Sequence, residues 1–361
     1  MNGESNKYTI FAINPGSTST KIGLFINEVE LWVQNLEHCE QELRAYEKIG
    51  EQLAYRKHRI LEAVAQKGHK AAEFSAIVGR GGMLPPLKAG GYTINKCMRE
   101  RLRKSQTGFH ASNLGALIAA AIAKPLAIPA YIYDAVSADE LYDIAKITGI
   151  PEVSRQSFCH VLNSKATCRK VAEKAGRRYE EMNFLVAHLG GGISISAHEK
   201  GKIVDVITDD AGPFSPERSG SIPLRTIVDM CYSNKYKHKD MLYKLRGMGG
   251  LKAHLGEHDC RKIEEMIAGG NIYAQNVYEA FAYQIAKGIG ELAPVLKGRV
   301  DAIVLTGGVA YSRMITDWVK ERVSFIADVE IIPGEYELEA LALGALRILR
   351  GEEDANEYKE N

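Results

Sequence analysis

The chain has 361 residues, enough for two domains that each bury a core of their own. Its 46 Lys and Arg residues nearly balance its 45 Asp and Glu residues, so its charge gives no reason to expect binding to nucleic acid or to an anionic membrane. The six cysteines form no C-x-x-C pair, which favours reduced thiols over a disulfide framework or a zinc site. The first ten residues lack the pattern of a signal peptide, and the longest apolar run, residues 114–123, is too short to span a bilayer. We therefore expect a soluble cytoplasmic protein.

The first motif is a predicted β-hairpin at residues 11–25 whose turn carries polar groups. An apolar run stops at the turn signal Asn-Pro-Gly, and a second apolar run follows. Strand alternation after the turn would place Ser17, Ser19 and Lys21 on one face. Two hydroxyls and one ammonium suit the phosphates of a nucleotide, and Gly16 allows the backbone to approach them closely. Taken alone, an ordinary polar hairpin with a solvated lysine explains the pattern equally well.

The next elements lead to an arginine flanked by glycines and to an aspartate at a strand end. We predict a helical region at 37–68, a strand at 74–78 that runs into Gly-Arg-Gly-Gly, a buried helix at 114–123, and a strand at 130–133 that precedes Asp134.

Residues 184–206 repeat the pattern of the first hairpin. An apolar strand runs into Gly190, Gly191 and Gly192, and two further strands follow. The glycines can offer backbone N–H groups to phosphate oxygens. Two copies of this pattern, separated by about half the chain, predict a duplicated domain whose two turns face each other across a cleft.

The remaining predicted elements are helices at 157–176, 222–245 and 272–296, strands at 302–305 and 329–332, and a final helix at 336–349. The strand at 302–305 ends in another glycine turn, Thr-Gly-Gly. The last eleven residues are polar, and we expect them to be frayed. Hairpins mixed with α/β crossovers predict two α/β domains with a boundary near residues 149–151.

Two arginines are candidates for binding an anionic substrate. Arg80 directly follows an apolar strand, and its glycine neighbours would let the guanidinium hold a carboxylate or phosphoryl group. Arg218 lies in the loop Pro-Glu-Arg-Ser-Gly, shortly after two aspartates. A surface arginine in the first case, and a structural pair with Glu217 in the second, are the alternatives.

Several carboxylates and histidines have open interpretations. Asp134 is placed as a metal ligand or general base would be, but a helix N-cap is equally consistent with its position. Glu335 and Glu337 open the final helix, where the helix dipole alone favours acidic residues. The candidate histidines, each as readily structural as catalytic, are His110, His160 and His188.

Seen together, the motifs resemble those of the acetokinase family, within the superfamily of actin, the sugar kinases and the Hsp70 ATPase. The resemblance covers essentially the whole chain and rests on INPGSTSTKIG, GRGG, HASN, YDAVSADE, FCHVLNSKA, AHLGGGIS, ERSGSIP, DCR, LTGGVAYS and PGEYELEALALGALR, in this order. HLGGG in place of the HLGNG of acetate kinases, and a shorter stretch before Arg218, make the chain most similar to butyrate and branched-chain fatty acid kinases. At Gly191 backbone N–H groups would have to replace the asparagine side chain.

The resemblance implies an α/β fold of two duplicated ribonuclease-H-like domains, with mixed sheets flanked by helices and a central cleft. Residues 1–153, together with a C-terminal helix at about 339–355, would bind the acid and the phosphates, and residues 154–338 would bind the nucleotide. In the first domain, the resemblance implies that the phosphates are bound by Asn14, Ser17, Ser19 and Lys21. Arg80 would clamp the carboxylate of the acid, and the acid site would be lined by Gly82, Phe109 and His110. Mg²⁺ would be bound by Asp134 and by a glutamate of the final helix, Glu337 or Glu335.

In the second domain, His160 would stabilise the phosphoryl group in transfer, and Arg218 would be the second clamp. Phosphate and nucleotide contacts are implied for His188, Gly190, Gly191, Gly192, Asp259, Arg261, Gly307 and Gly308. Gly82 and Cys159 stand where acetate kinases have a valine and a phenylalanine. The lost side chains should open room for extra methylenes, each worth about 0.8 kcal/mol when buried, and Phe109 would refill part of that room.

The implied reaction is reversible transfer of a phosphoryl group from ATP, with Mg²⁺, to a short-chain carboxylate such as butyrate, isobutyrate or valerate. The products would be an acyl phosphate and ADP, and we expect a homodimer or larger assembly with no nucleic-acid or membrane partner. An acetate or propionate kinase is one alternative. A non-transferase ATPase of the Hsp70 or actin type is another, although it would leave Arg80 and Arg218 without a role.

Overall fold

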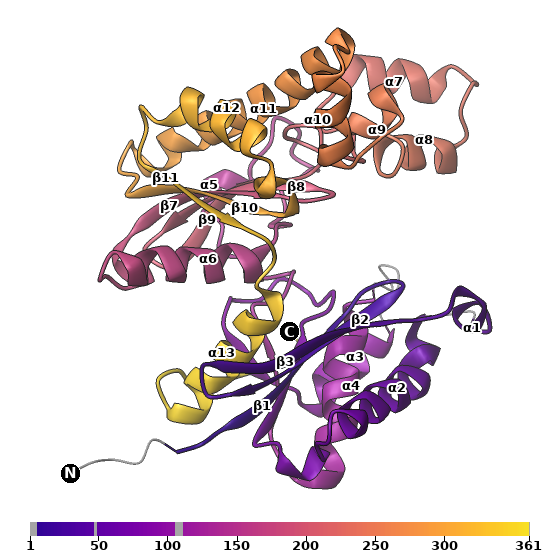
Figure 1. The fold of residues 1–361 in the computed structure, drawn as a ribbon, viewed down its shortest axis with the longest axis vertical. Coiled ribbons are helices and arrows are strands. Elements are labelled where there is room, and N and C mark those ends of the chain that lie inside the picture. Colours follow the sequence, from indigo (N-terminus) through magenta and orange to yellow (C-terminus); the bar gives the residue numbers. More distant parts are fainter. Residues whose placement is uncertain (1–5, 47–48, 105–110, 361) are drawn as a thin grey trace. The chain divides into compact units, whose positions relative to one another are not determined.

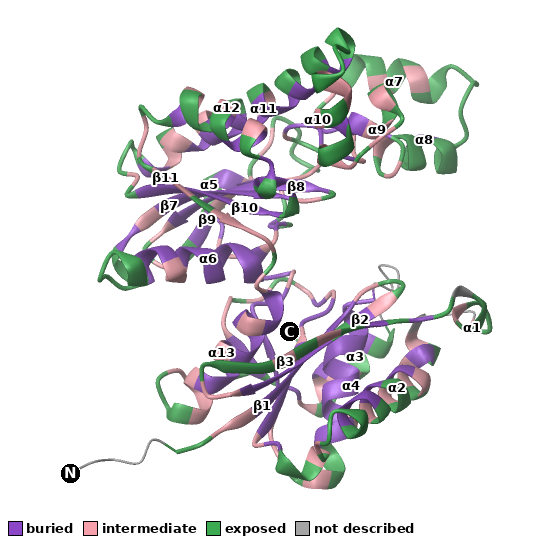
Figure 2. Cartoon of the chain, in the orientation of Figure 1, coloured by how far each residue is buried: buried purple, intermediate pink, exposed green. Residues whose placement is uncertain are grey.

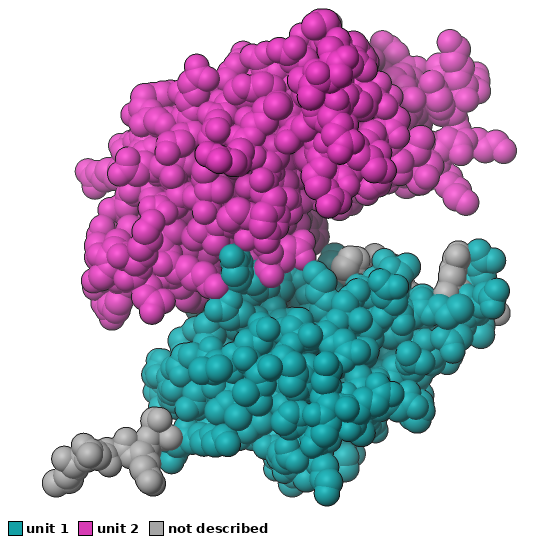
Figure 3. Space-filling view, viewed as in Figure 1, with its two compact units in different colours: residues 1–139, 336–361 teal, residues 140–335 magenta. Residues whose placement is uncertain are grey.

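A computed structural model describes residues 6–46, 49–104 and 111–360, and the chain divides into two compact units (Figures 1 and 3). Unit 1 comprises residues 1–139 and 336–361, and unit 2 comprises residues 140–335. The chain passes from unit 1 to unit 2 between residues 139 and 140 and returns to unit 1 between residues 335 and 336. The boundaries expected from the sequence were 153/154 and 338/339. Each unit has its own sheet and its own hydrophobic core.

In the described residues, the sheet of unit 1 has the strand order β12-β5-β6-β4-β1-β2-β3. Its strands are β1 (Thr9–Pro15), β2 (Ser19–Ile26), β3 (Val29–Glu37), β4 (Ala76–Arg80), β5 (Gly91–Thr93), β6 (Ala130–Tyr133) and β12 (Asn356–Glu357). Strands β1, β2 and β3 form an antiparallel meander, and β4 and β6 continue the sheet in parallel with β1. The polar turn between β1 and β2 and the residues after β4 and β6 therefore lie at one edge of the sheet.

Helices cover both faces of this sheet (Figure 1). They are α1 (Glu40–Arg44), α2 (Leu53–Gln66), α3 (Lys96–Lys104), α4 (Asn113–Ala123) and α13 (Glu337–Arg350). The run of Leu, Ile and Ala in α4 is buried almost throughout, because this helix lies between the sheet and α2. The opposite face is covered by α13, which packs on β1 and β4 although it follows the whole of unit 2 in the sequence.

The C-terminal tail is ordered as far as residue 360, so the expectation that it frays is wrong. Strand β12 pairs in parallel with β5. Tyr358 is only 5% exposed and belongs to the core of unit 1, and its carbonyl accepts a hydrogen bond of 2.7 Å from Asn95 Nδ2. One buried aromatic residue anchors an otherwise polar segment.

Unit 2 has the strand order β11-β10-β7-β8-β9 among its strands β7 (Asn183–Leu189), β8 (Ile193–Glu199), β9 (Lys202–Ile207), β10 (Ala302–Gly307) and β11 (Val329–Pro333). Its helices are α5 (Asp143–Lys146), α6 (Val161–Lys174), α7 (Leu224–Tyr232), α8 (His238–Leu245), α9 (Gly250–Leu255), α10 (Cys260–Ala268), α11 (Ile272–Leu292) and α12 (Arg313–Val323). Helix α6 packs on β7 and β10 from one side, and α11 packs on β7, β8 and β9 from the other.

The two sheets share one topology. An antiparallel meander of three strands is followed by two parallel strands, in the order β3-β2-β1-β4-β6 in unit 1 and β9-β8-β7-β10-β11 in unit 2. This repetition confirms the predicted α/β fold of duplicated domains. Burial follows the sheets, whereas α7 and α8 are largely exposed (Figure 2). Among the described residues, no helix is long and apolar enough to cross a membrane.

Candidate functional site

The predicted phosphate-binding turn joins β1 and β2 in unit 1. Asn14 pairs with Lys21 across the hairpin, and a hydrogen bond of 2.8 Å from Gly16 N–H to the Ser19 carbonyl closes the turn. Strand β2 begins at Ser19, so Ser17 lies in the turn itself and is exposed. Lys21 is exposed on the face that Asn14 shares, because residues directly opposite each other in an antiparallel pair point to the same side.

Arg80, at the end of β4, contacts both the hairpin and the final helix. Its Nη1 donates to Glu337 Oε2 over 3.1 Å and to Asn14 Oδ1 over 3.3 Å. Asn14 Nδ2 donates to the same Glu337 oxygen. Glu337 is the first residue of α13 and is only 9% exposed. Of the two glutamates left open by the sequence, Glu337 lies among the candidate residues of unit 1, whereas Glu335 belongs to unit 2.

Asp134 follows β6 in a conformation that non-glycine residues rarely adopt, with φ of +42°. Two hydrogen bonds with Gly90 hold it: its N–H donates to the Gly90 carbonyl over 3.1 Å, and its Oδ1 accepts from Gly90 N–H over 2.9 Å. Asp134 caps no helix in the described chain, since the next helix, α5, begins at Asp143. A buried carboxylate fixed in a strained turn is typical of a functional site.

The side chains of Asp134 and Glu337 carry carboxylate oxygens, the kind of ligand that Mg²⁺ prefers. The part of the chain that the structure describes contains no group of three or more His, Cys, Asp or Glu residues able to hold a metal ion. This donor set fits Mg²⁺ that is bound through one or two carboxylates and takes its other ligands from phosphates and water.

The predicted acid-binding residues of unit 1 are only partly described. Phe109 and His110 lie outside the described residues. A Cβ atom on Gly82 would come within 2.5 Å of Asn113 Oδ1 and 2.7 Å of Asn113 Cα. The space that a side chain at position 82 would occupy is therefore filled by α4, rather than left open for extra methylenes.

Two candidate histidines of unit 2 stack on each other. The rings of His160 and His188 are 3.7 Å apart between centroids and nearly parallel, with an interplanar angle of 8°. His160 Nδ1 lies 2.8 Å from Ser194 Oγ on β8. Two imidazolium ions at this separation would repel by about 4 kcal/mol at an effective dielectric constant of about 20, so the pair can carry at most one charge without strain.

Asn163, three residues after His160 on α6, orients His188. Its Nδ2 lies 3.0 Å from His188 Nδ1 and 3.1 Å from Thr306 Oγ1 on β10. Thr306 Oγ1 donates to the Gly334 carbonyl over 3.3 Å, so it accepts from Asn163. An amide that donates to Nδ1 fixes the tautomer of His188 with its proton on Nε2, where it can donate to an anion.

The glycine turn after His188 accommodates Arg218. A Cβ atom on Gly192 would lie 2.3 Å from Arg218 Nη1 and 2.5 Å from Arg218 Cζ, so only glycine lets the guanidinium lie against the turn. Arg218 pairs with Asp209, and Arg246 reaches the same carboxylate oxygen over 2.9 Å. Arg218 therefore pairs with Asp209 and not with Glu217, the partner that the sequence had left open.

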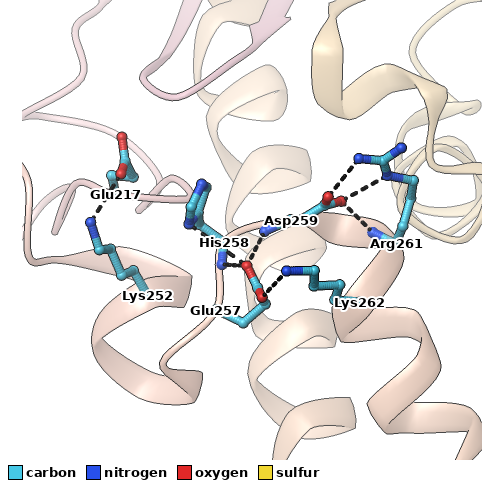
Figure 4. Close-up of polar contacts among 7 residues, drawn as sticks. All are labelled: Glu217, Lys252, Glu257, His258, Asp259, Arg261 and Lys262. Carbon is cyan, nitrogen blue, oxygen red and sulfur yellow. Dashed lines mark hydrogen bonds and ion pairs between the residues drawn. The ribbon is translucent and has the colours of Figure 1, made fainter.

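The predicted adenosine-binding residues form a local network at the start of α10 (Figure 4). Asp259 is the N-cap of this helix and binds Arg261 through the backbone N–H at 3.0 Å and through the side chain at 2.6 Å. The Arg261 guanidinium lowers the pKa of Asp259 to about 2. Glu217 instead pairs with Lys252 at 3.2 Å (Figure 4).

The third glycine turn closes the edge of the unit 2 sheet. Gly307 has φ of +89° and exchanges two backbone hydrogen bonds with Gly334, of 3.1 and 3.0 Å. A Cβ atom on Gly308 would meet no atom within 4 Å. The open surface at Gly308 is accessible to a ligand.

Residues 138–330 match the acetokinase family, and this region is more than half of the chain. The chain belongs to the acetokinase family. It is therefore a carboxylate kinase that uses ATP and ADP.

Solved structures agree with this acetokinase fold. Acetate kinase from Porphyromonas gingivalis superposes with a TM-score of 0.79 at 18% identity, over 95% of this chain and 100% of that one. A propionate kinase from Francisella tularensis gives 0.74 at 18% identity, over 93% and 98%. A ROK family protein from Streptococcus pneumoniae gives 0.52 at 14% identity, over 96% and 100%.

The environment of Cys159 in this acetokinase keeps its thiol protonated and unreactive. Cys159 precedes His160 and is only 6% exposed. Burial raises the pKa of its thiol to about 12, so the group stays protonated and acts as a small apolar side chain.

The sequence did not reveal the residues that orient the candidate side chains, namely Asn163, Ser194, Asp209 and Arg246. Of these, Asn163 carried a usable signal, because it lies one helical turn after His160.

Proposed function

We propose that this acetokinase transfers a phosphoryl group reversibly between ATP and an acid of three to five carbons, with butyrate as its preferred substrate. The observation that carries the proposal is the contact of Asn14 with both Arg80 and Glu337. Asn14 belongs to the phosphate-binding hairpin, and Arg80 is the candidate carboxylate clamp. One hydrogen-bonded cluster thus joins the group that would hold the acid to the group that would hold the phosphates.

The reaction depends more on neutralising the negative charges of the two substrates than on a general base. A carboxylate is already an ionised nucleophile, so the main obstacle is its repulsion by the phosphates, about 4 kcal/mol for two unit charges 4 Å apart at an effective dielectric constant of about 20. Arg80, Arg218 and Lys21 would offset this repulsion and stabilise the charge on the transferring phosphoryl group. Bound Mg²⁺, held by Asp134 and Glu337, would neutralise phosphate charge.

The paired histidines would act as hydrogen-bond donors. His188, with its proton on Nε2, would donate to a phosphate oxygen without adding a full charge beside His160. The N–H groups of the turn at Gly190–Gly192 would supply the contacts for which acetate kinases use an asparagine side chain.

The preference for butyrate rests mainly on Cys159. A small thiol where acetate kinases have a phenylalanine should admit extra methylenes, each worth about 0.8 kcal/mol when buried, or about fourfold in kcat/KM. Gly82 does not add to this argument, because Asn113 and Leu102 fill the space beside it.

Trapping of acyl phosphates with hydroxylamine tests the proposal. We expect acyl hydroxamate from propionate, butyrate, isobutyrate and valerate, with kcat/KM highest for a four-carbon acid. A value for acetate equal to or above those of butyrate and isobutyrate would overturn the assignment of the acid. Failure to form hydroxamate from any acid, while ATP is still hydrolysed, would overturn the assignment of the reaction.

We further propose that the protein forms homodimers through α7 and α8. Leu224, Val228 and Tyr232 form one apolar stripe along α7 and are 82%, 54% and 83% exposed. On α8, Leu242 and Tyr243 are more than half exposed. Apolar surface of this extent is typical of an interface.

Light scattering after gel filtration tests the dimer. The wild type should give twice the chain mass, and a Leu224→Lys, Tyr232→Lys variant should give the monomer mass. A monomeric wild type would contradict the proposal.

A further inference from the structure

Arg56 is a fully buried arginine in α2, a helix whose sequence looks like an ordinary charged surface helix. Burying a guanidinium is costly unless its donors are all bound. Hydrogen bonds from the Arg56 guanidinium, most of them to the hairpin formed by β1 and β2, offset this cost.

Two of its five hydrogen bonds go to the turn of this hairpin, and two go to the first two residues of β2. Nη1 donates to the Gly16 carbonyl over 2.8 Å, to the Ser19 carbonyl over 3.0 Å and to Thr20 Oγ1 over 3.1 Å. Nη2 donates to the Ser17 carbonyl over 2.8 Å, and Nε donates to Gln52 Oε1 over 3.0 Å. One planar fork therefore holds three backbone carbonyls within four residues.

These bonds also determine where the N–H groups of the turn point. The peptide bonds of the described chain are all trans, so each N–H points away from the carbonyl of the same peptide group. Because the Gly16 and Ser17 carbonyls face Arg56, the N–H groups of Ser17 and Thr18 point to the opposite side. Ser17 and Thr18 are both exposed. Successive outward N–H groups form a typical binding place for an anion.

Arg56 also brings a positive charge beneath this anion site. Among the residues that the structure describes, no carboxylate pairs with it, and its acceptors are neutral carbonyl, amide and hydroxyl oxygens. Burial lowers the pKa of Arg56 to about 10, which still leaves the guanidinium charged at neutral pH.

We propose that Arg56 is a positioning residue for the nucleotide phosphates: it holds residues 16–20 so that the N–H groups of Ser17 and Thr18 face the phosphate, and its charge adds to phosphate affinity. This inference rests on the proposed assignment of the hairpin to phosphate binding. It predicts that Arg56 affects ATP more than the acid.

The test compares Arg56→Lys with the matched control Arg59→Lys. Lysine keeps the charge, but its single ammonium cannot reach four acceptors spread along the hairpin. Arg59 lies three residues further along the same helix, with a side chain that is 44% exposed. For Arg56→Lys we expect the Kd of ATP to rise about tenfold, kcat to fall about tenfold, KM for the acid to stay within twofold, and amide hydrogen exchange in residues 14–21 to accelerate. Arg59→Lys should match the wild type in all four.

Gln52→Ala keeps the test decisive if Arg56→Lys does not fold. It removes only the acceptor of Nε, so it should shift the Kd of ATP and the exchange of residues 14–21 in the same direction but less. Unchanged ATP affinity and unchanged exchange in a folded variant would overturn the inference. Faster exchange with unchanged ATP affinity would show instead that the hairpin is not the phosphate site, which would refute the proposed function of the turn rather than the contacts of Arg56.

Discussion

Arg80 Nη1 lies 3.1 Å from Glu337 Oε2, although 257 positions separate the two residues in the sequence. The contact ties the end of β4 to the first turn of α13, and Asn14 joins them from the hairpin. The final helix is thus not only a cover for the sheet of unit 1. It supplies the carboxylate that orients the arginine we assign to the acid.

We predict that Arg80→Ala lowers kcat roughly a hundredfold or more, because a preorganised donor to the reacting anions is lost. The rate of hydroxamate formation at saturating ATP measures the effect. Arg103→Ala is the control, since Arg103 is exposed on α3 and should leave kcat unchanged. Near-normal turnover of Arg80→Ala would refute the role of Arg80 as a clamp.

For Arg218, the glycine turn offers a second way to test its role. Arg218→Ala should also lower kcat roughly a hundredfold. Gly192→Ala should lower it about tenfold with little change in Tm, because the new methyl group would displace the guanidinium, which is the far end of a flexible side chain. Gly290→Ala on α11 is the control and should keep the wild-type kcat, since its methyl group would meet no atom within 4 Å. Equal turnover in the two alanine variants would show that the position of Arg218 against the turn is unimportant.

Local patterns were sufficient to predict much of the fold. Runs of apolar residues and neighbouring turn signals predict both hairpins with their glycine turns, the strands that lead to Arg80 and Asp134, and the buried helix α4. Strand β3 was not predicted, because it is an edge strand that leaves Val29, Leu31 and Val33 exposed and so lacks a clear alternation.

What could not be predicted depends on contacts between distant residues. Arg56 resembles the other charged residues of its helix in sequence, and only the packing of α2 under the hairpin reveals that it is buried. Gly82 was interpreted as space for a longer acid, whereas Asn113 fills that space. A glycine in the sequence indicates a missing side chain but not which neighbour occupies its place.

The packing at Gly82 leads to a prediction about stability. Gly82→Ala should lower the free energy of unfolding of unit 1 by about 1–3 kcal/mol, because its Cβ would overlap Asn113 and press on Leu102. Urea unfolding followed through Trp32, in a Trp318→Phe background, reports on unit 1. Gly16→Ala, also in unit 1, should have little effect, because its Cβ would make only ordinary contacts with Ser19, at 3.5 and 3.6 Å. Unchanged stability together with a lower kcat/KM for butyrate would support the original interpretation of Gly82 as part of the acid pocket.

His38 makes the stability of unit 1 depend on pH. It is only 6% exposed, and its Nε2 lies 2.8 Å from Thr20 Oγ1 in the hairpin that Arg56 holds. Burial, together with the positive charges of Arg56 and Arg59, lowers the pKa of His38 from 6.5 to about 4. Because the unfolded chain takes up the proton first, the contribution of His38 to stability is complete above pH 6.5 and is lost as the pH falls towards 4.

The expected slope from this one group is at most about 1.4 kcal/mol per pH unit over that window. His38→Gln should therefore flatten the decline in the free energy of unfolding of unit 1 between pH 6.5 and 4, measured through Trp32. His58→Gln is the control, since the side chain of His58, on α2, is 73% exposed, and this variant should keep the wild-type slope. Equal slopes in the two variants would mean that His38 takes up its proton equally readily in the folded and unfolded chains, which burial beside the hairpin should prevent.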